Sequence, residues 1–77
     1  MRIEHLLCVV FELDPADAPI TESTGREDVD GWDSLQHLSV VAALEETYMV
    51  TFTTSEMADL VSVPAIRRIL KSRAVDA

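Results

Sequence analysis

Three helix-start signals follow one another from residue 33 onward, and no other feature constrains the fold as much. They are Asp33 with Gln36 three residues on, Thr53 with Glu56 at the same spacing, and Ser62 before Val63 and Pro64. In such a signal a short oxygen-bearing side chain accepts a hydrogen bond from the first turn, where backbone N–H groups have no helical acceptor. Proline is tolerated there because it has no N–H to satisfy. The signals predict helices over 34–49, over 54–60 and from Ser62 onward.

An apolar stripe predicts a further helix at the start of the chain, over residues 2–13. Its members recur at helical spacing and are Ile3, Leu6, Leu7, Val10 and Phe11. Asp14 and Pro15 should end this helix, because the residue before a proline avoids helical dihedral angles.

A long connection, residues 14–32, joins the first two predicted helices. Connections of this length are uncommon in compact domains, so we expect Ile20 and Val29 to anchor it in the core. The sequence therefore predicts an all-α fold with four helices, a long first loop and a short third helix, in a single domain over residues 1–77.

The net charge of −8 excludes partners that require a basic surface. Nucleic acids and anionic membranes are bound chiefly through Lys and Arg, of which the chain has six against fourteen acids. Between residues 12 and 59 there are twelve acids and one base, Arg26, so a basic protein partner would be steered toward this part.

The cysteine count and the hydropathy pattern predict where the protein resides. Cys8 is the only cysteine, so a disulfide within the chain is impossible and a reducing compartment fits. The apolar run at residues 6–11 is too short to span a membrane, and the start of the chain lacks the pattern of a signal peptide. We expect a monomeric cytoplasmic protein.

Three patterns of enzyme or metal chemistry are present only in part. They are Asp33, Ser34 and His37, the residue types of a catalytic triad; Asp28, Asp30 and Gly31, part of a calcium loop; and His5 with Cys8, half of a zinc site. A triad usually draws its members from separate elements, not from one helix start. The calcium loop fails because its final glutamate position falls on His37, and two ligands do not make a zinc site. The sequence thus favours neither an enzyme nor a metal site.

Ser34 stands at the start of the predicted second helix and permits two interpretations. With Asp33 as the N-cap, the Ser34 hydroxyl faces solvent, and a phosphate ester there would lie at the positive end of the helix dipole. Alternatively Ser34 is itself the cap and Asp33 only flanks it. Helix chemistry alone favours the second interpretation, because serines are common at helix starts.

The predicted second helix has two apolar stripes instead of one. Val40, Val41, Leu44 and Tyr48 form the first, and Leu35, Leu38, Ala42 and Met49 form the second. A small helical protein usually buries both. If one is exposed, it forms a docking surface beside Glu45 and Glu46, with Ser34 at its N-terminal end.

The stretch GWDSLQHLSVVAALEETYMVTF, residues 31–52, resembles the core of the acyl carrier protein family, peptidyl carriers included. The resemblance lies in an Asp-Ser-Leu triplet at a helix start, followed by an aliphatic helix that ends in two acids and an aromatic residue. The segments ITEST and TTSEMADLVSVPAI fall where that family has its loop and its third and fourth helices. The similarity runs along nearly the whole chain and implies an acyl-carrier-protein-like four-helix bundle.

The resemblance implies that Ser34 is esterified by the 4′-phosphopantetheine of coenzyme A, which a separate phosphopantetheinyl transferase delivers with a magnesium ion. The thiol of this arm then carries an acyl or aminoacyl group as a thioester, and the carrier performs no catalysis and holds no metal of its own. By the same resemblance Asp33 engages the transferase and its metal, and Leu35 flanks the arm.

The resemblance also implies a recognition surface on the second helix. Glu45 and Glu46 match acidic positions of that surface, while Leu38 and Ala42 belong, with Leu35, to its exposed apolar side. The partners implied are loading, condensing and transferring enzymes with basic docking surfaces.

Two departures from fatty-acid-synthesis carriers favour a specialised pathway. Those carriers usually have acids where this chain has Gln36 and Ser39, and the Trp-Asp-Ser-Leu-x-His pattern is closer to carriers of secondary metabolism. We expect a freestanding carrier for polyketide, nonribosomal peptide or modified fatty acid synthesis, in which Trp32 and His37 are either pathway markers or packing residues. The alternative is a carrier-like helical module that stays unmodified and only binds a partner.

Overall fold

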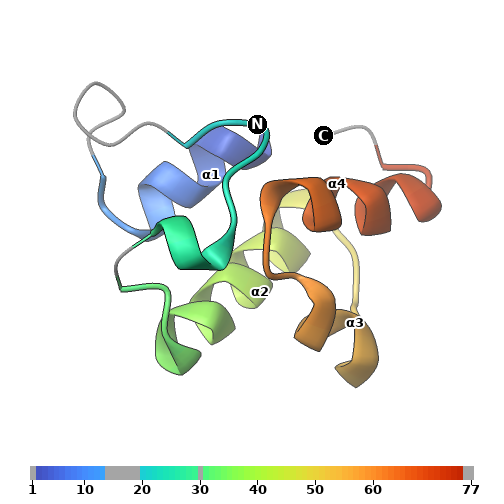
Figure 1. Cartoon of the computed structure of the whole chain (residues 1–77). Coiled ribbons are helices and arrows are strands. Elements are labelled where there is room, and N and C mark those ends of the chain that lie inside the picture. The colour runs from blue at the N-terminus through green and yellow to red at the C-terminus, as the bar shows by residue number, and fades with distance from the viewer. Residues whose placement is uncertain (1, 14–19, 30, 76–77) are drawn as a thin grey trace.

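The computed structural model describes residues 2–13, 20–29 and 31–75. Over these residues the elements are α1 (Ile3–Val10), the 3₁₀ helix η1 (Arg26–Asp28), α2 (Ser34–Tyr48), α3 (Thr54–Asp59) and α4 (Val63–Ser72) (Figure 1). The described part of the chain contains four α-helices and no strand, which confirms the predicted all-α class and the short third helix. None of these helices combines the length and the apolar character that crossing a membrane requires.

The three predicted helix starts are confirmed by their caps. Asp33 Oδ1 accepts a hydrogen bond from the Gln36 N–H at 2.9 Å, and Ser62 Oγ accepts one from the first turn of α4 at 3.1 Å. In α3 the capping box is complete, because Thr53 Oγ1 accepts from the Glu56 N–H at 3.1 Å and Glu56 Oε1 accepts from the Thr53 N–H at 2.9 Å. Asp33 is thus the N-cap of α2, and Ser34 is the first residue inside the helix.

The first helix ends earlier than predicted. α1 stops at Val10, and Glu12 adopts a left-handed conformation with φ of 55°. The Glu12 N–H then bonds the Val9 carbonyl at 3.2 Å, and the Leu13 N–H bonds the Cys8 carbonyl at 2.9 Å. This pair of hydrogen bonds is a Schellman motif, which satisfies the last carbonyls and returns Leu13 to the core. The predicted stop at Asp14 and Pro15 is therefore wrong, and those residues lie outside the described ones.

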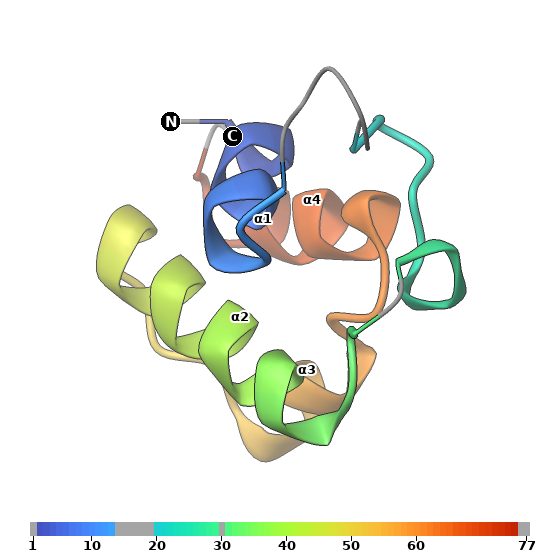
Figure 2. The same cartoon turned by 90° about the vertical axis from the view of Figure 1, so that its left-hand side faces the viewer.

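The core lies where α1 meets both α2 and α4, and α3 packs on α4 at one end (Figure 2). Its fully buried side chains are Ile3, Leu7, Val40, Leu44, Leu60, Val63, Ile66 and Leu70. The first apolar stripe of α2 supplies Val40, Val41 and Leu44 to this core, with Tyr48 half-buried at its end. Ile69 of α4 packs against this core and is half-buried.

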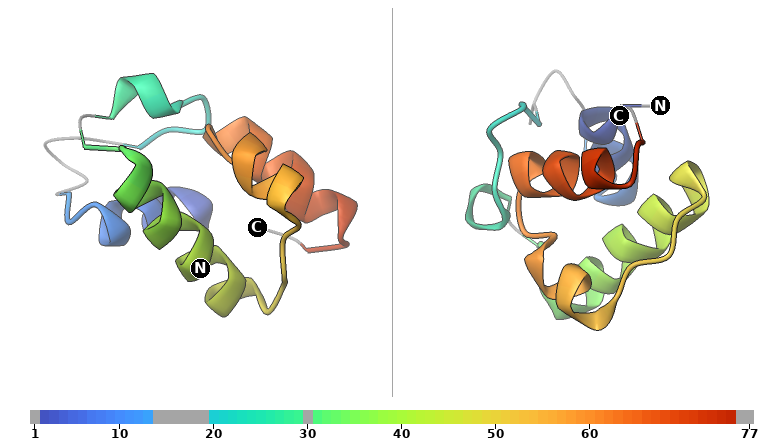
Figure 3. Two further views of the ribbon diagram at one scale, coloured as in Figure 1. Left: turned by 90° about the horizontal axis from the view of Figure 1, so that it is seen from below. Right: turned by 90° about the vertical axis from the view of Figure 1, so that its right-hand side faces the viewer.

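The described end of the first connection, residues 20–29, is fastened to the junction between α3 and α4 (Figure 3). The Arg26 N–H bonds the Val61 carbonyl and the Val63 N–H bonds the Thr24 carbonyl, each at 2.8 Å. Val29 is buried and Ile20 packs against the core, as predicted. The sequence pattern does not predict η1 within this segment.

Candidate functional site

Ser34 is exposed at the N-terminal end of α2, and an uncovered apolar surface begins beside it. We call this surface the outer stripe; it comprises Leu35, Leu38, Ala42 and Met49, all exposed. The exposed fractions of Leu35, Leu38 and Met49 are 77%, 63% and 87%, whereas large apolar side chains usually lie inside. The structure therefore buries one apolar stripe of α2 and leaves the other open to solvent.

The Asp33 carboxylate is exposed, and one of its oxygens is committed to capping α2. Among the described residues no hydrogen bond reaches its second oxygen, which stays available to an external ligand. The N–H groups of Ser34 and Leu35 have no intrahelical acceptor, as at any helix start. An oxygen-rich group at Ser34 would therefore meet unpaired N–H donors and the positive end of the helix dipole.

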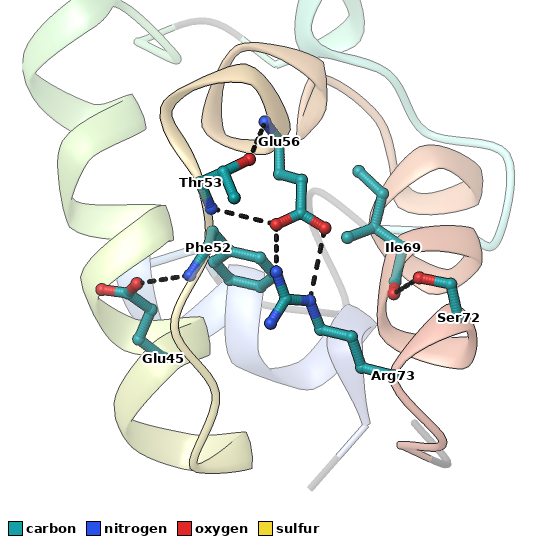
Figure 4. A network of polar contacts seen from close by, with 7 residues as sticks. All are labelled: Glu45, Phe52, Thr53, Glu56, Ile69, Ser72 and Arg73. Carbon is teal, nitrogen blue, oxygen red and sulfur yellow. Dashed lines mark hydrogen bonds and ion pairs between the residues drawn. The ribbon is translucent and has the colours of Figure 1, made fainter.

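Glu45 and Glu46, adjacent in sequence, differ in their surroundings. Glu45 is half-buried, and its Oε2 accepts a hydrogen bond from the Phe52 N–H at 2.9 Å (Figure 4). Glu46 is exposed, and within the described residues its carboxylate takes part in no hydrogen bond or ion pair. Glu45 thus has a structural contact that the sequence analysis missed, because only the fold brings the 50–53 linker back along α2.

Trp32 and His37 form a hydrogen-bonded chain that links the segment before Ser34 to α3. The indole N–H of Trp32 donates to His37 Nδ1 at 3.0 Å, and His37 Nε2 lies 2.7 Å from the Met57 carbonyl oxygen. Because Nδ1 accepts, the proton of the neutral ring must be on Nε2, which donates to Met57. Trp32 is only 4% exposed and its ring centroid lies 5.3 Å from that of Phe11. Both residues therefore have packing roles, whatever further role each has.

The hydrogen bonds of His37 also show whether Asp33, Ser34 and His37 are arranged as a catalytic triad. His37 directs one ring nitrogen to Trp32 and the other to Met57, so neither nitrogen is directed to the Ser34 hydroxyl. His5 is exposed and Cys8 is buried with a free thiol. Over the described residues no three His, Cys, Asp or Glu side chains gather as metal ligands, while Asp30 of the calcium-loop pattern lies outside them.

Two ion pairs connect acids to the basic C-terminal segment, Arg67 in α4 and Arg73 just after it. Arg67 donates to both carboxylate oxygens of Glu4, at 2.9 and 3.0 Å. Burial by itself would raise the pKa of Glu4, but hydrogen bonds to its own backbone and to Arg67, with the Arg67 charge, hold it below its ordinary value. Burial and the charge of Glu4 raise the pKa of the nearby Tyr48 hydroxyl.

The second ion pair joins Arg73 to Glu56 beside the α3 capping box (Figure 4). The Arg73 guanidinium also lies over the Phe52 ring, 5.6 Å from its centroid. The hydrogen bond from Arg73, followed by that from the Thr53 N–H, lowers the pKa of Glu56. This network fixes α3 to the end of α4.

Comparisons of the chain with protein-family models, with curated proteins and with solved structures found no match. The functional conclusion therefore depends on Ser34 and the residues around it.

Proposed function

We propose that the protein is a carrier that holds an acyl or aminoacyl group as a thioester on a 4′-phosphopantetheine arm attached to Ser34. The observation that carries the proposal is the position of this serine. Its hydroxyl is exposed, it occupies the first turn of a 15-residue helix, and it is spared capping because Asp33 supplies the cap. The order and type of the four helices support the acyl-carrier-protein-like arrangement that the sequence resemblance implies.

The residues around Ser34 suit an attached phosphopantetheine group. Ser34 Oγ would form the bond to phosphorus, while the pyrophosphate bond of coenzyme A breaks and the hydroxyl proton and 3′,5′-ADP leave. The N–H groups of Ser34 and Leu35 would face the resulting phosphodiester at the positive end of α2. The carboxylate oxygen of Asp33 that does not cap α2 is suited to bind the magnesium ion of the transferase. When bound, the arm supplies a thiol for thioester formation.

The outer stripe supports docking of partner enzymes next to the attachment site. Its exposed Leu35 and Leu38 offer apolar area, and Glu46 adds an accessible negative charge that a basic surface would complement. With Gln36 and Ser39 in place of acids, the helix is less negative than in fatty-acid-synthesis carriers. We therefore favour a carrier of a specialised pathway, in polyketide, nonribosomal peptide or modified fatty acid synthesis.

Intact-mass spectrometry tests the proposal directly. The protein is incubated with coenzyme A, magnesium and a broad-specificity phosphopantetheinyl transferase, alongside Ser34→Ala and Ser39→Ala. Ser39 is also an exposed serine on α2, so its substitution is a matched control. We expect a gain of one phosphopantetheine in the wild type and in Ser39→Ala, and none in Ser34→Ala. A folded wild-type protein that gains no mass would refute the carrier.

A second candidate function is an unmodified helical module that only binds a partner protein. The exposed outer stripe favours it as well, because a docking surface does not require a modified serine. The same experiment separates the two, since only the carrier is a substrate of the transferase.

A further inference from the structure

We infer that an open cleft beside the start of α2 seats the phosphopantetheine arm when its thiol is not with a partner enzyme. This inference rests on the proposed function. The cleft has a volume of about 480 Å³ and is lined by Arg26, Glu27, Trp32 and Val61. A volume of this size is within the range of pockets that bind small organic molecules, roughly 300–1,000 Å³.

The cleft lies within easy reach of Ser34. Trp32 precedes Ser34 by two residues, so their Cα atoms are at most about 7 Å apart even in a fully extended chain. An arm attached to Ser34 is therefore tethered at the edge of the cleft. Tethering raises its local concentration there and makes even weak contacts effective.

The walls of the cleft are held in place by hydrogen bonds. The Arg26 N–H bonds the Val61 carbonyl at 2.8 Å, and the Arg26 Nε–H bonds the Trp32 carbonyl at 2.9 Å. The Trp32 indole is fixed in turn by His37. A cleft with fixed walls costs little ordering entropy when it is filled.

The lining chemistry matches the arm better than it matches a hydrocarbon chain. Two of the four lining residues are charged, which disfavours a bare fatty chain because their desolvation would not be compensated. The pantetheine arm carries amides, a hydroxyl and a geminal dimethyl group. The remaining N–H groups of Arg26 can donate to an amide carbonyl, and Glu27 can accept from an amide N–H. The exposed Val61 side chain offers apolar surface to the methyl groups, with only the small accessible part of the buried Trp32 beside it.

Nuclear Overhauser effects between arm and protein test the inference. The protein, labelled with ¹³C and ¹⁵N, is modified with unlabelled coenzyme A, and the extent of modification is measured by intact mass. We expect isotope-filtered spectra to show contacts from the geminal methyl protons of the arm to the Val61 methyl groups and the Trp32 ring. The assignment is simplified because Trp32 is the only tryptophan. Chemical-shift changes at Trp32 would not suffice, since attachment at Ser34 alone could cause them.

A matched pair of variants provides the control. Val61→Phe fills the cleft and should abolish the methyl contacts to Trp32, whereas Val9→Phe enlarges an exposed valine on α1 outside the cleft and should preserve them. Complete modification without contacts to Val61 or Trp32 in the wild type would overturn the inference and leave the carrier intact. Methyl contacts to Trp32 that persist in folded Val61→Phe would also overturn it. Absence of modification would instead refute the proposed function.

Discussion

Glu45 and Glu46 occupy neighbouring positions on α2 but differ in what each carboxylate touches. Glu45 binds the Phe52 N–H and so fastens the linker after α2, whereas Glu46 projects into solvent. A charge-reversal of both residues would change folding and recognition at once. Single substitutions are therefore needed to separate the two effects.

We predict that Glu46→Lys slows modification of Ser34 and weakens its dependence on salt, while the free energy of unfolding changes by less than about 0.5 kcal/mol. Transferase rates at two ionic strengths and urea unfolding measure both quantities. Glu22→Lys, at an exposed acid in the first connection, controls for net charge. An unaltered salt response in Glu46→Lys would count against a recognition role for this residue.

Glu45→Ala, in contrast, should destabilise the fold by about 1–2 kcal/mol, because it leaves the Phe52 N–H without its charged acceptor. Glu45→Gln keeps an acceptor oxygen and should lose less than half as much. Chemical denaturation of the two variants measures their free energies of unfolding and checks that Glu45→Ala loses more than Glu45→Gln. Equal stability of Glu45→Ala and wild type would show that water replaces the carboxylate without cost.

Trp32→Phe removes the indole N–H but retains an aromatic ring in the core. We expect a loss of about 1–2 kcal/mol, because His37 Nδ1 is left without its donor. A double-mutant cycle with His37→Ala isolates the contribution of the pair. Strictly additive effects of the two substitutions would mean that the hydrogen bond contributes nothing to stability.

At the scale of elements, α3 depends on its surroundings more than any other α-helix in the described chain. Its six residues are far too few for an isolated helix in water. It is held by the Thr53–Glu56 capping box, by Arg73, the residue that follows α4, and by the His37 contact to the Met57 carbonyl. Loss of one of these contacts should therefore loosen α3 before it unfolds the molecule.

Thr53→Ala is predicted to cost about 1 kcal/mol, the usual value of an N-cap. Amide hydrogen exchange should speed up in α3 more than in α4, because only α3 loses its cap. Thr54→Ala, at the adjacent exposed threonine that does not cap, is the matched control and should leave exchange nearly unchanged. Equal acceleration throughout the chain would contradict a local role for the cap.

The sequence predicted the beginnings of α2, α3 and α4 because a cap is a local signal that involves residues three positions apart. It failed at the end of α1, where the stop depends on Leu13 returning to a core that exists only in the fold. It missed η1 for a related reason, since that turn is fastened by the distant Val61.

The candidate site was predictable to a similar degree. The position of Ser34 followed from the Asp33 cap, but the different contacts of Glu45 and Glu46 did not. Those contacts depend on where the linker through Phe52 runs relative to α2.

At the scale of the whole molecule, two acids pair in space with arginines that lie far from them in the sequence. Glu4 and Glu56 each bind an arginine of the C-terminal segment, and the pKa of each carboxyl is lowered below its ordinary value near 4.5. Carboxyls with a depressed pKa stabilise the fold when the pH is above their unfolded value. That contribution disappears as the pH falls through the folded value.

We therefore predict that the contribution of these two ion pairs to the free energy of unfolding is constant near neutral pH and is lost as the pH falls below about 4.5. Urea unfolding at a series of pH values measures this slope. Glu4→Gln and Glu56→Gln should each lower stability at pH 7 and flatten the acid limb, because the ionisable partner is gone. An acid limb as steep in the double variant as in the wild type would assign acid sensitivity to other carboxyls.

The division of α2 into a buried and an open side has a consequence for how this protein can change over time. Positions on the outer stripe within α2 make little contribution to the core, so replacing Leu38 should alter stability by no more than about 0.5 kcal/mol. If this surface docks partner enzymes, as we propose, successive single replacements there would redirect the protein to a new enzyme while every intermediate variant stays folded. The buried side, by contrast, admits few changes at Val40 or Leu44 without loss of packing. One helix thus combines a fixed half that preserves the scaffold with a half that selection or an engineer can rewrite residue by residue.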